Sequence, residues 1–211
     1  MVEISNIKVY DLEESVIACR NAMRLTPAAP TAKEFSESLK RAKILASSPS
    51  NSGHANFLKG IRVSFDIKYP NYFSPELQRY AFCDIVTSSS KMHKILKMAT
   101  MPEAYNKYVN QASLDNMKHL VQSYNIACET GSVEDQYEAF MMVVSNCPQG
   151  IELFMRCSTN YMQLRNIYNQ RHNHKLKEDW GAFCHFIEGL PYACDFITYD
   201  VDKKNSEGSS N

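Results

Sequence analysis

Apolar and polar residues alternate along Ile61–Lys68, where every second side chain is apolar. A period of two with several β-branched residues is typical of a strand with one buried face. The turn Tyr69-Pro70-Asn71 follows, and a Pro in the first turn favours a helix over Pro75–Ile85. The run Thr87–Lys91 is rich in hydroxyl groups and predicts a loop. The centre of the chain is therefore predicted to be strand, turn, helix and loop.

The same kinds of pattern predict the remaining elements. A further strand is expected at Ile7–Tyr10. Helices are expected over Glu13–Met23, over Ala32–Ala46 with Thr31 as its cap, over Ser113–Thr130 closed by Gly131, from Ser132 onward, and over Leu176–Leu190. The small polar stretch Ala46–Gly53 predicts an exposed loop.

Helical spacing also predicts which side chains face the core. The inward positions are Val16, Ala18, Cys19 and Ala22 in the first helix, Phe35, Leu39 and Ile44 in the second, and Trp180, Phe183, Phe186 and Ile187 in the last. The third and fourth helices carry an apolar, Met-rich face that is typical of a core or of a subunit interface: Leu114, Met117, Leu120, Val121, Tyr124 and Cys128 in the third, and Tyr137, Phe140, Met141 and Val144 in the fourth. Strands and helices interspersed in this way predict a single α/β (α+β) domain over residues 1–201, with helices packed on a mixed sheet. Residues 202–211 are polar and predict a disordered tail.

Length and charge exclude several classes of protein. The 211 residues are 44% hydrophobic, enough for one core but not for two independent ones. The 23 basic and 23 acidic residues cancel, so no net field draws the chain to nucleic acid or to an anionic membrane. No apolar run approaches the ~20 residues of a membrane span, and Met1–Ser5 does not resemble a signal peptide. A cytoplasmic location is therefore expected.

Cysteine and histidine spacing indicates no metal site. The seven Cys residues show no C-x-x-C spacing and fit reduced, structural thiols. His172 and His174 are the one close His pair, and no acidic or Cys pattern completes a ligand set around them. No metal is predicted.

Candidate binding chemistry comes from a few polar positions. Ser88-Ser89-Ser90 before Lys91 supplies hydroxyl donors, backbone N–H groups and a cation, which together suit an anion such as a phosphate. Serine runs are also ordinary loop sequence. His54 before a strand is either a structural hydrogen-bonding residue or part of a ligand site. Arg171 is either on a solvated helix face or in a site.

The order of these residues resembles the flavin-dependent thymidylate synthases of the ThyX type. In that family a His precedes a strand that leads, through a Pro turn, into a helix with the pattern Gln-x-x-Arg-His-Arg and then a loop Ser-x-Asn-Glu-x-Ser-x-Arg. The stretch from His54 to Lys91 follows this order without a gap. His54, Arg79 and Ser89 keep the family's residue. Lys91 keeps only the charge of the phosphate-binding Arg, because an ammonium lacks the bidentate fork.

Other positions depart from the family's signature. Tyr80 and Ala81 stand where the family has the His and Arg that contact FAD, and Thr87 replaces the loop Glu. Glu76 stands where the family has Gln. A carboxylate there would repel a nucleotide phosphate unless Arg79 pairs with it across one helical turn.

A second stretch also resembles the family. There, a Pro turn, a strand, an Asn and a helix of the form Asn-x-x-x-x-Arg follow one another, as do Pro148, Ile151–Thr159, Asn160, and Asn166 to Arg171 here. The resemblance places Asn160 and Asn166 near the flavin and Arg171 at the nucleotide. Four residues before the Pro, Val144 replaces an Arg that reaches a neighbouring subunit's nucleotide.

The resemblance implies a ThyX-like fold, a homotetramer with sites between subunits, and a pyrimidine nucleotide such as dUMP as ligand. It assigns flavin binding to His54, Arg79, Asn160 and Asn166, and it implies FAD, methylenetetrahydrofolate and NADPH if the chain is catalytic. It assigns nucleotide binding to Glu76, Arg79, Ser88, Ser89, Ser90, Lys91 and Arg171, with Ser89 and Arg171 also in the catalytic role. One hypothesis is an enzyme that transfers a one-carbon unit to C5 of the base. The alternative is a non-catalytic relative that has lost FAD and binds or sequesters a nucleotide or serves in an assembly.

Overall fold

The computed structural model describes residues 1–48 and 53–199. The strands are β1 (Glu3–Tyr10), β2 (Arg62–Pro70), β3 (Asp84–Ser88) and β4 (Glu152–Asn160). The α-helices are α1 (Leu12–Ala18), α2 (Ala32–Ala46), α3 (Ser74–Leu77), α4 (Lys91–Met98), α5 (Gln111–Thr130), α6 (Val133–Asn146), α7 (Tyr161–Arg171), α8 (Lys177–Glu188) and α9 (Ala193–Phe196). The tail predicted at 202–211 and residues 49–52 of the predicted loop lie outside the described residues.

The strands form one four-stranded sheet in the order β1-β2-β4-β3. Every pairing in it is antiparallel, so the expectation of a mixed sheet is wrong, although the α+β fold class is confirmed. The long central pair β2 and β4 sets the register, with Phe65 opposite Cys157 and Ile67 opposite Met155. These four side chains are buried. The alternation predicted for β2 is thereby confirmed, because one face of the sheet lies in the core and the residues of the other face are mostly half-buried.

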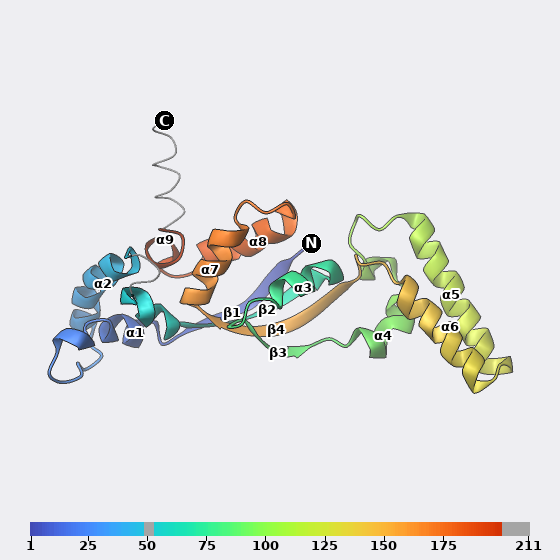
Figure 1. The fold of residues 1–211 in the computed structure, drawn as a ribbon, viewed down its shortest axis with the longest axis horizontal. Helices are drawn as coiled ribbons and strands as arrows, with labels where there is room; N and C mark the ends of the chain where they lie inside the picture. Colours follow the sequence, from blue (N-terminus) through green and yellow to red (C-terminus); the bar gives the residue numbers. More distant parts are fainter. Residues whose placement is uncertain (49–52, 200–211) are drawn as a thin grey trace, which may run out of the picture.

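Helices α3, α7 and α8 lie on one side of this sheet (Figure 1). The core between them is rich in aromatic rings, with the Phe73 and Trp180 centroids 4.5 Å apart and those of Phe65 and Phe186 4.9 Å apart. The core positions predicted for the last helix are all buried: Trp180, Phe183, Phe186 and Ile187. Burial of such rings supplies much of the driving force for folding.

Helices α5 and α6 form a hairpin that extends away from the sheet (Figure 1). A small separate core holds it, in which Met117 and Val121 of α5 pack with Val143 of α6. The turn is fixed by a capping box, because the Ser132 hydroxyl accepts from the Asp135 N–H and the Asp135 carboxylate accepts from the Ser132 N–H. Both predicted helices are confirmed. On their predicted apolar faces, Cys128 and Tyr137 are exposed in the single chain.

The prediction of a helix over Pro75–Ile85 is correct only for its first turn. Helix α3 ends at Leu77, and Asp84–Ser88 form the edge strand β3. Asp84 pairs with Ser158 and Ile85 with Cys157 of β4. Ile85, Val86 and Thr87 are β-branched and fit a strand, and the unpaired edge of β4 supplies their backbone partners. The predicted hydroxyl-rich loop is therefore partly strand.

The first two helices also differ from prediction in detail. Helix α1 ends at Ala18, and a 3-10 turn over Asn21–Met23 replaces its predicted last turn, which leaves Ala18 and Ala22 exposed. Thr31 caps α2 as predicted, accepting from the Glu34 N–H. Ile44 is exposed rather than inward. The buried face of α2 consists of Ser38, Ala42, Leu45 and Ala46.

Candidate functional site

Glu76 and Arg171, both assigned to the nucleotide by resemblance, meet in one cluster. Helix α3 presents Glu76 toward the C-terminal end of α7, where Arg171 is the last residue. Arg171 Nη1 lies 3.0 Å from Glu76 Oε2, and Trp180 of α8 donates its indole N–H to the same oxygen at 2.7 Å. His174 Nε2 lies 3.6 Å from that oxygen. Arg79 is exposed and is not the partner of Glu76, which instead pairs with Arg171.

Tyr80 completes this cluster. Its ring is buried, and its hydroxyl accepts from Arg171 Nε at 2.7 Å and donates to Gln170 at 3.1 Å. The Arg171 guanidinium carbon lies 4.6 Å from the Trp180 ring centroid and 5.6 Å from that of Tyr80. Hydrogen bonds and cation–π contacts therefore fix the guanidinium against two aromatic rings. We call Glu76, Tyr80, Arg171, His174 and Trp180 the Arg171 cluster.

A cavity of about 480 Å³ adjoins the Arg171 cluster. Lys177, at the first position of α8, and His172 bring further cationic or ionisable groups to its lining. Its other lining residues are Arg171, Asn173, His174, Trp180 and Gly181. Its lining is rich in basic groups, and Glu76, which does not line it, is the carboxylate bound to the lining residue Arg171. Such a lining can hold an anion only where a cation is not already neutralised.

The serine run lies at a second place, where β3 meets α4. Ser88 ends β3, and Ser89 extends the pairing because its N–H donates to the Phe154 carbonyl at 2.8 Å and its Oγ accepts from the Phe154 N–H at 3.2 Å. The Ser90 hydroxyl caps α4 by accepting from the His93 N–H. Two of the three hydroxyls thus have structural partners, which the loop interpretation of this run did not foresee.

The serine run lines a cavity of about 680 Å³ on the exposed side of the sheet. Its cations are Lys68, Lys94 and Arg156, and the Lys94 ammonium lies 5.1 Å from the Phe154 ring centroid. We call this the serine cavity. Lys91 does not line it. Burial raises the pKa of the Cys147 thiol, and the positive charge of Lys91 lowers that pKa by a smaller amount.

An ordered network of polar groups runs along the exposed sheet face. Asp66 and Arg156 face each other on β2 and β4, joined at 3.0 Å, and Asn6 of β1 donates to the other Asp66 oxygen at 3.0 Å. Hydrogen bonds from Asn6 and Arg156 lower the pKa of Asp66. Arg156 is therefore already neutralised, and Lys94 is the cation of the serine cavity that has no carboxylate partner among the described residues.

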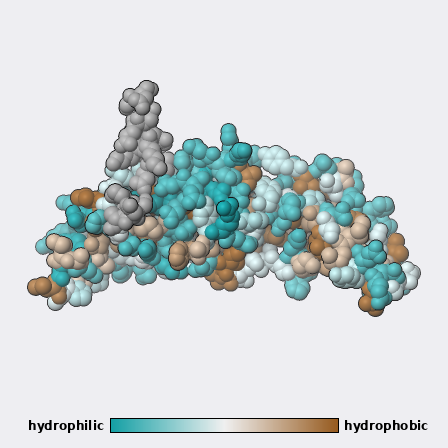
Figure 2. All heavy atoms as spheres, in the orientation of Figure 1, coloured by the Kyte–Doolittle hydropathy of each residue, from teal (hydrophilic) through white to brown (hydrophobic). Residues whose placement is uncertain are grey.

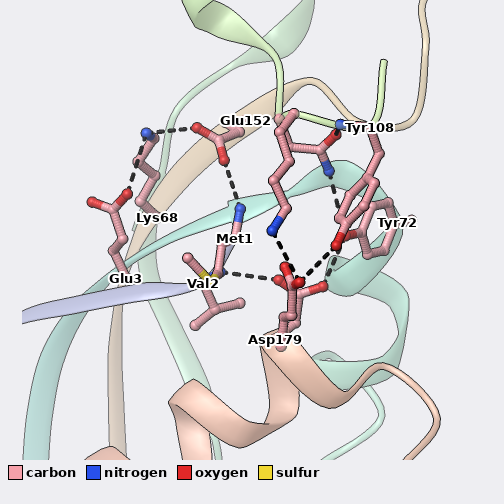
Figure 3. A network of polar contacts seen from close by, with 11 residues as sticks. Met1, Val2, Glu3, Lys68, Tyr72, Tyr108, Glu152 and Asp179 are labelled. Atoms are coloured by element: carbon pink, nitrogen blue, oxygen red, sulfur yellow. Dashed lines mark hydrogen bonds and ion pairs between the residues drawn. The ribbon is translucent and has the colours of Figure 1, made fainter. Parts of the chain in front are cut away.

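A second network fastens β1 to α8 at the end of the sheet (Figure 3). The buried Asp179 accepts from the Val2 N–H at 3.0 Å and from the Tyr72 hydroxyl at 2.8 Å. Lys68 bridges Glu3 and Glu152. Burial and the hydrogen bond to Asp179 raise the pKa of Tyr72. These groups pair with one another, so the network fastens β1 and α8 to the sheet.

His54 lies at a third place, at the first position of the 3-10 turn His54–Lys59. It lines a cavity of about 1070 Å³ between this turn, α1 and α2. Arg20, Lys40 and Arg41 also line this cavity, which we call the His54 cavity. Arg20 pairs with Glu37 at 3.4 Å, whereas Lys40 and Arg41 have no ion-pair partner in residues 1–48 and 53–199.

The two Asn residues assigned to the flavin have different surroundings. Asn160 caps α7, since its side-chain oxygen accepts from the Gln163 N–H at 2.9 Å. Asn166 is exposed on the same helix. Glu76 with Arg171, the serine run, and His54 thus lie at three separate places. Arg79, Lys91, Asn160 and Asn166 line none of the three cavities there. Sequence reasoning missed the polar roles of Tyr80, Trp180 and Lys94, because no local pattern links residues so far apart.

Two features that the described residues lack bear on the class of function. In residues 1–48 and 53–199, no group of three or more His, Cys, Asp or Glu side chains could hold a metal ion. No helix in the same part of the chain has both the length and the apolar character needed to cross a membrane.

No protein-family profile and no curated protein matches the sequence. Solved structures do match the fold. A flavin-dependent thymidylate synthase ThyX from Helicobacter pylori, complexed with FAD and dUMP, superposes with a TM-score of 0.65 at 13% identity, over 94% of this chain and 98% of the other. A second H. pylori ThyX structure with FAD and dUMP gives the same score and identity over 95% and 98%.

This chain has the ThyX fold. The match spans nearly the whole of both chains, so neither the sheet nor the α5–α6 hairpin is an addition to that fold. At 13% identity the likeness establishes architecture and leaves ligands to be argued from the residues present.

Proposed function

We propose that this chain is a nucleotide-binding protein with the ThyX fold, and that its ligand is a pyrimidine nucleotide such as dUMP. The observation that carries the proposal is the whole-chain match to ThyX structures that contain dUMP and FAD. The serine cavity supports it with chemistry of this chain. Ser88 and Ser90 offer hydroxyl groups beside Lys94, whose charge is not neutralised by a carboxylate among the described residues.

We propose further that the complete site forms between copies of the chain in a homotetramer. Within one chain His54, the serine run and Arg171 line three different cavities, so one ligand can contact all of them only if more than one copy contributes. Exposed apolar side chains on and beside β3 suit self-association: Phe82 is 67% exposed, Val86 64% and Phe154 58%. Figure 2 shows a hydrophobic patch at the lower edge of the molecule, where β3 lies in Figure 1.

FAD fits the His54 cavity in size and charge. The cavity of about 1070 Å³ is large enough for a dinucleotide, since ligand pockets commonly measure ~300–1,000 Å³. Lys40 and Arg41 would neutralise the diphosphate, and Phe57 and Ile44 supply apolar wall. When bound, a flavin supplies hydride transfer. His54 and its neighbours would then hold and orient it, and the activity expected is one-carbon transfer to C5 of the pyrimidine with methylenetetrahydrofolate and NADPH.

One observation favours the non-catalytic alternative. Tyr80 stands where the ThyX pattern has a flavin-contacting His, and its hydroxyl is already engaged by Arg171 and Gln170. Because Tyr80 is committed to this internal contact, it would not be available to a flavin. In this alternative the chain binds a nucleotide and no FAD.

The proposed function is tested by thermal unfolding of the full chain with dUMP, dCMP and the purine monophosphate dAMP. A ligand that binds only the folded state raises Tm with concentration. Nucleotide binding of the proposed kind raises Tm with dUMP or dCMP and not with dAMP. Equal shifts with all three, or none, contradict it. The visible spectrum with added FAD then separates the flavoenzyme from the binding protein.

A further inference from the structure

The Arg171 guanidinium is held from several sides by its own chain. Its Nε donates to the Tyr80 hydroxyl at 2.7 Å, its Nη1 donates to Glu76 at 3.0 Å, and its plane lies against Trp180. The side chain is only 12% exposed. A guanidinium this confined cannot swing away to meet a ligand, so any anion it binds must come to it.

Glu76 already occupies the position of such an anion. One carboxylate oxygen accepts from both Arg171 and Trp180 and lies within 3.6 Å of His174. The indole N–H and the guanidinium N–H are the kinds of donor that a phosphate oxygen would otherwise use. The carboxylate thus stands in for a phosphate oxygen beside Arg171, His174 and Trp180. These three residues line the same cavity as Lys177 and His172.

We propose that Glu76 is an internal competitor that keeps phosphate-bearing ligands away from Arg171, and so sets the affinity of this site for them. The inference rests on the proposed function, because it concerns how strongly a nucleotide phosphate can engage the same Arg171. A phosphate that approaches the cavity meets the negative charge of Glu76 and must displace it. The substitution of Glu76 by Gln removes that charge and keeps the shape of the side chain. The Arg171 guanidinium then no longer pairs with a carboxylate, but it stays in place because Tyr80 and Trp180 still hold it.

A purely structural ion pair would behave differently. If Glu76 only fastened α3 to α7 and α8, its neutralisation would lower the free energy of unfolding and leave phosphate affinity unchanged. If Glu76 competes with ligand anions, neutralisation raises affinity for phosphate and leaves affinity for a ligand without phosphate unchanged. A change in the affinity for phosphate therefore distinguishes a competing role of Glu76 from a purely structural one.

Trp180 provides a direct probe, because it is the one Trp of the chain and touches both Glu76 and Arg171. The experiment compares the unaltered full chain with Glu76→Gln, titrating inorganic phosphate, dUMP and deoxyuridine while recording Trp180 fluorescence. Glu178→Gln is the matched control, since it removes an α8 carboxylate that pairs with Lys107 instead. Glu76→Ala serves as a second variant.

The proposal predicts at least tenfold tighter binding of inorganic phosphate and dUMP by Glu76→Gln, with deoxyuridine and the Glu178→Gln variant unchanged. Unchanged or weaker phosphate binding by folded Glu76→Gln or Glu76→Ala overturns it. Tight phosphate binding by the unaltered chain, accompanied by a change in Trp180 fluorescence, also overturns it. This second result does not depend on whether a variant folds. Tighter phosphate binding without any dUMP binding would uphold the role of Glu76 and contradict the proposed function.

Discussion

Trp180 donates its indole N–H to Glu76 across 104 residues of sequence, at 2.7 Å. Trp180 is fully buried, and the Glu76 carboxylate also accepts a hydrogen bond from Arg171. The bond therefore ties α8 to α3 and fixes the geometry of the Arg171 cluster, so the packing core and the candidate site share a residue.

Trp180→Phe removes the indole donor and part of the ring. Hydrogen bonds to charged acceptors contribute about 1.5–3 kcal/mol, and the smaller ring leaves a gap against Phe73. We expect the free energy of unfolding to fall by about 2–3 kcal/mol, measured by urea denaturation followed by circular dichroism. In a Glu76→Leu background the same substitution should cost less, because its partner is gone. Additive losses would show that the bond contributes nothing.

Thr159 anchors the start of β3. Its buried hydroxyl donates to the Phe82 carbonyl at 2.7 Å. Thr159→Val keeps the shape and removes the donor, so we expect a loss of about 1 kcal/mol and faster amide hydrogen exchange along β3. Thr159→Ser keeps the donor and serves as the control. Equal exchange rates in the Val variant and the parent would mean that β4 pairing alone holds this strand.

Glu152 makes stability depend on pH. Burial alone would raise its pKa. The hydrogen bonds from Lys68 and from the terminal amine lower the pKa by more in total, so it lies below the ordinary value. The pKa of Glu152 is lower in the folded state than in the unfolded state, so ionised Glu152 stabilises the fold above the unfolded-state pKa of about 4.3. This stabilisation is lost as pH falls through the folded-state pKa.

Lys68→Met tests this linkage. The variant should be less stable at pH 7 by about 0.5–1 kcal/mol, with the difference shrinking toward pH 3 as Glu152 is protonated. Lys68→Arg, which keeps the charge, should follow the parent. Urea unfolding at several pH values measures both. A Lys68→Met deficit that is the same at pH 3 and pH 7 would assign the loss to packing instead of charge.

Val86 tests the proposed assembly. It is 64% exposed on the edge strand β3, so Val86→Asp should cost the single chain little but oppose association through β3. We expect smaller particles by size-exclusion chromatography with light scattering. Val133→Asp is the control, being 76% exposed at the start of α6, far from β3. An unchanged particle mass for Val86→Asp would exclude β3 from the interface.

Sequence patterns predicted the elements whose signals are local. The alternation of Val63, Phe65 and Ile67 is dictated by one buried sheet face, and the Thr31 cap of α2 is a contact between neighbours in sequence. Strand β3 escaped prediction because its pairing partner β4 lies some 70 residues later, and a helix-like spacing of apolar residues precedes it. Edge pairing is a tertiary interaction that outweighs local propensity.

The candidate site was predictable only in its residue types. The resemblance singled out Glu76 and Arg171 separately, and the one-turn pairing considered for Glu76 and Arg79 followed from helical spacing. Helix α3 ends before Arg79, so that geometry does not arise. The actual partner approaches from α7, a contact that depends on how the helices stack over the sheet.

Calorimetric titration of the full chain with dUMP tests the central claim most directly. The account predicts saturable binding with a stoichiometry of one nucleotide per chain, weaker at high salt because a phosphate is bound, and no binding of dAMP. Absence of heat and of any Tm shift at millimolar dUMP would contradict a nucleotide-binding function for this fold.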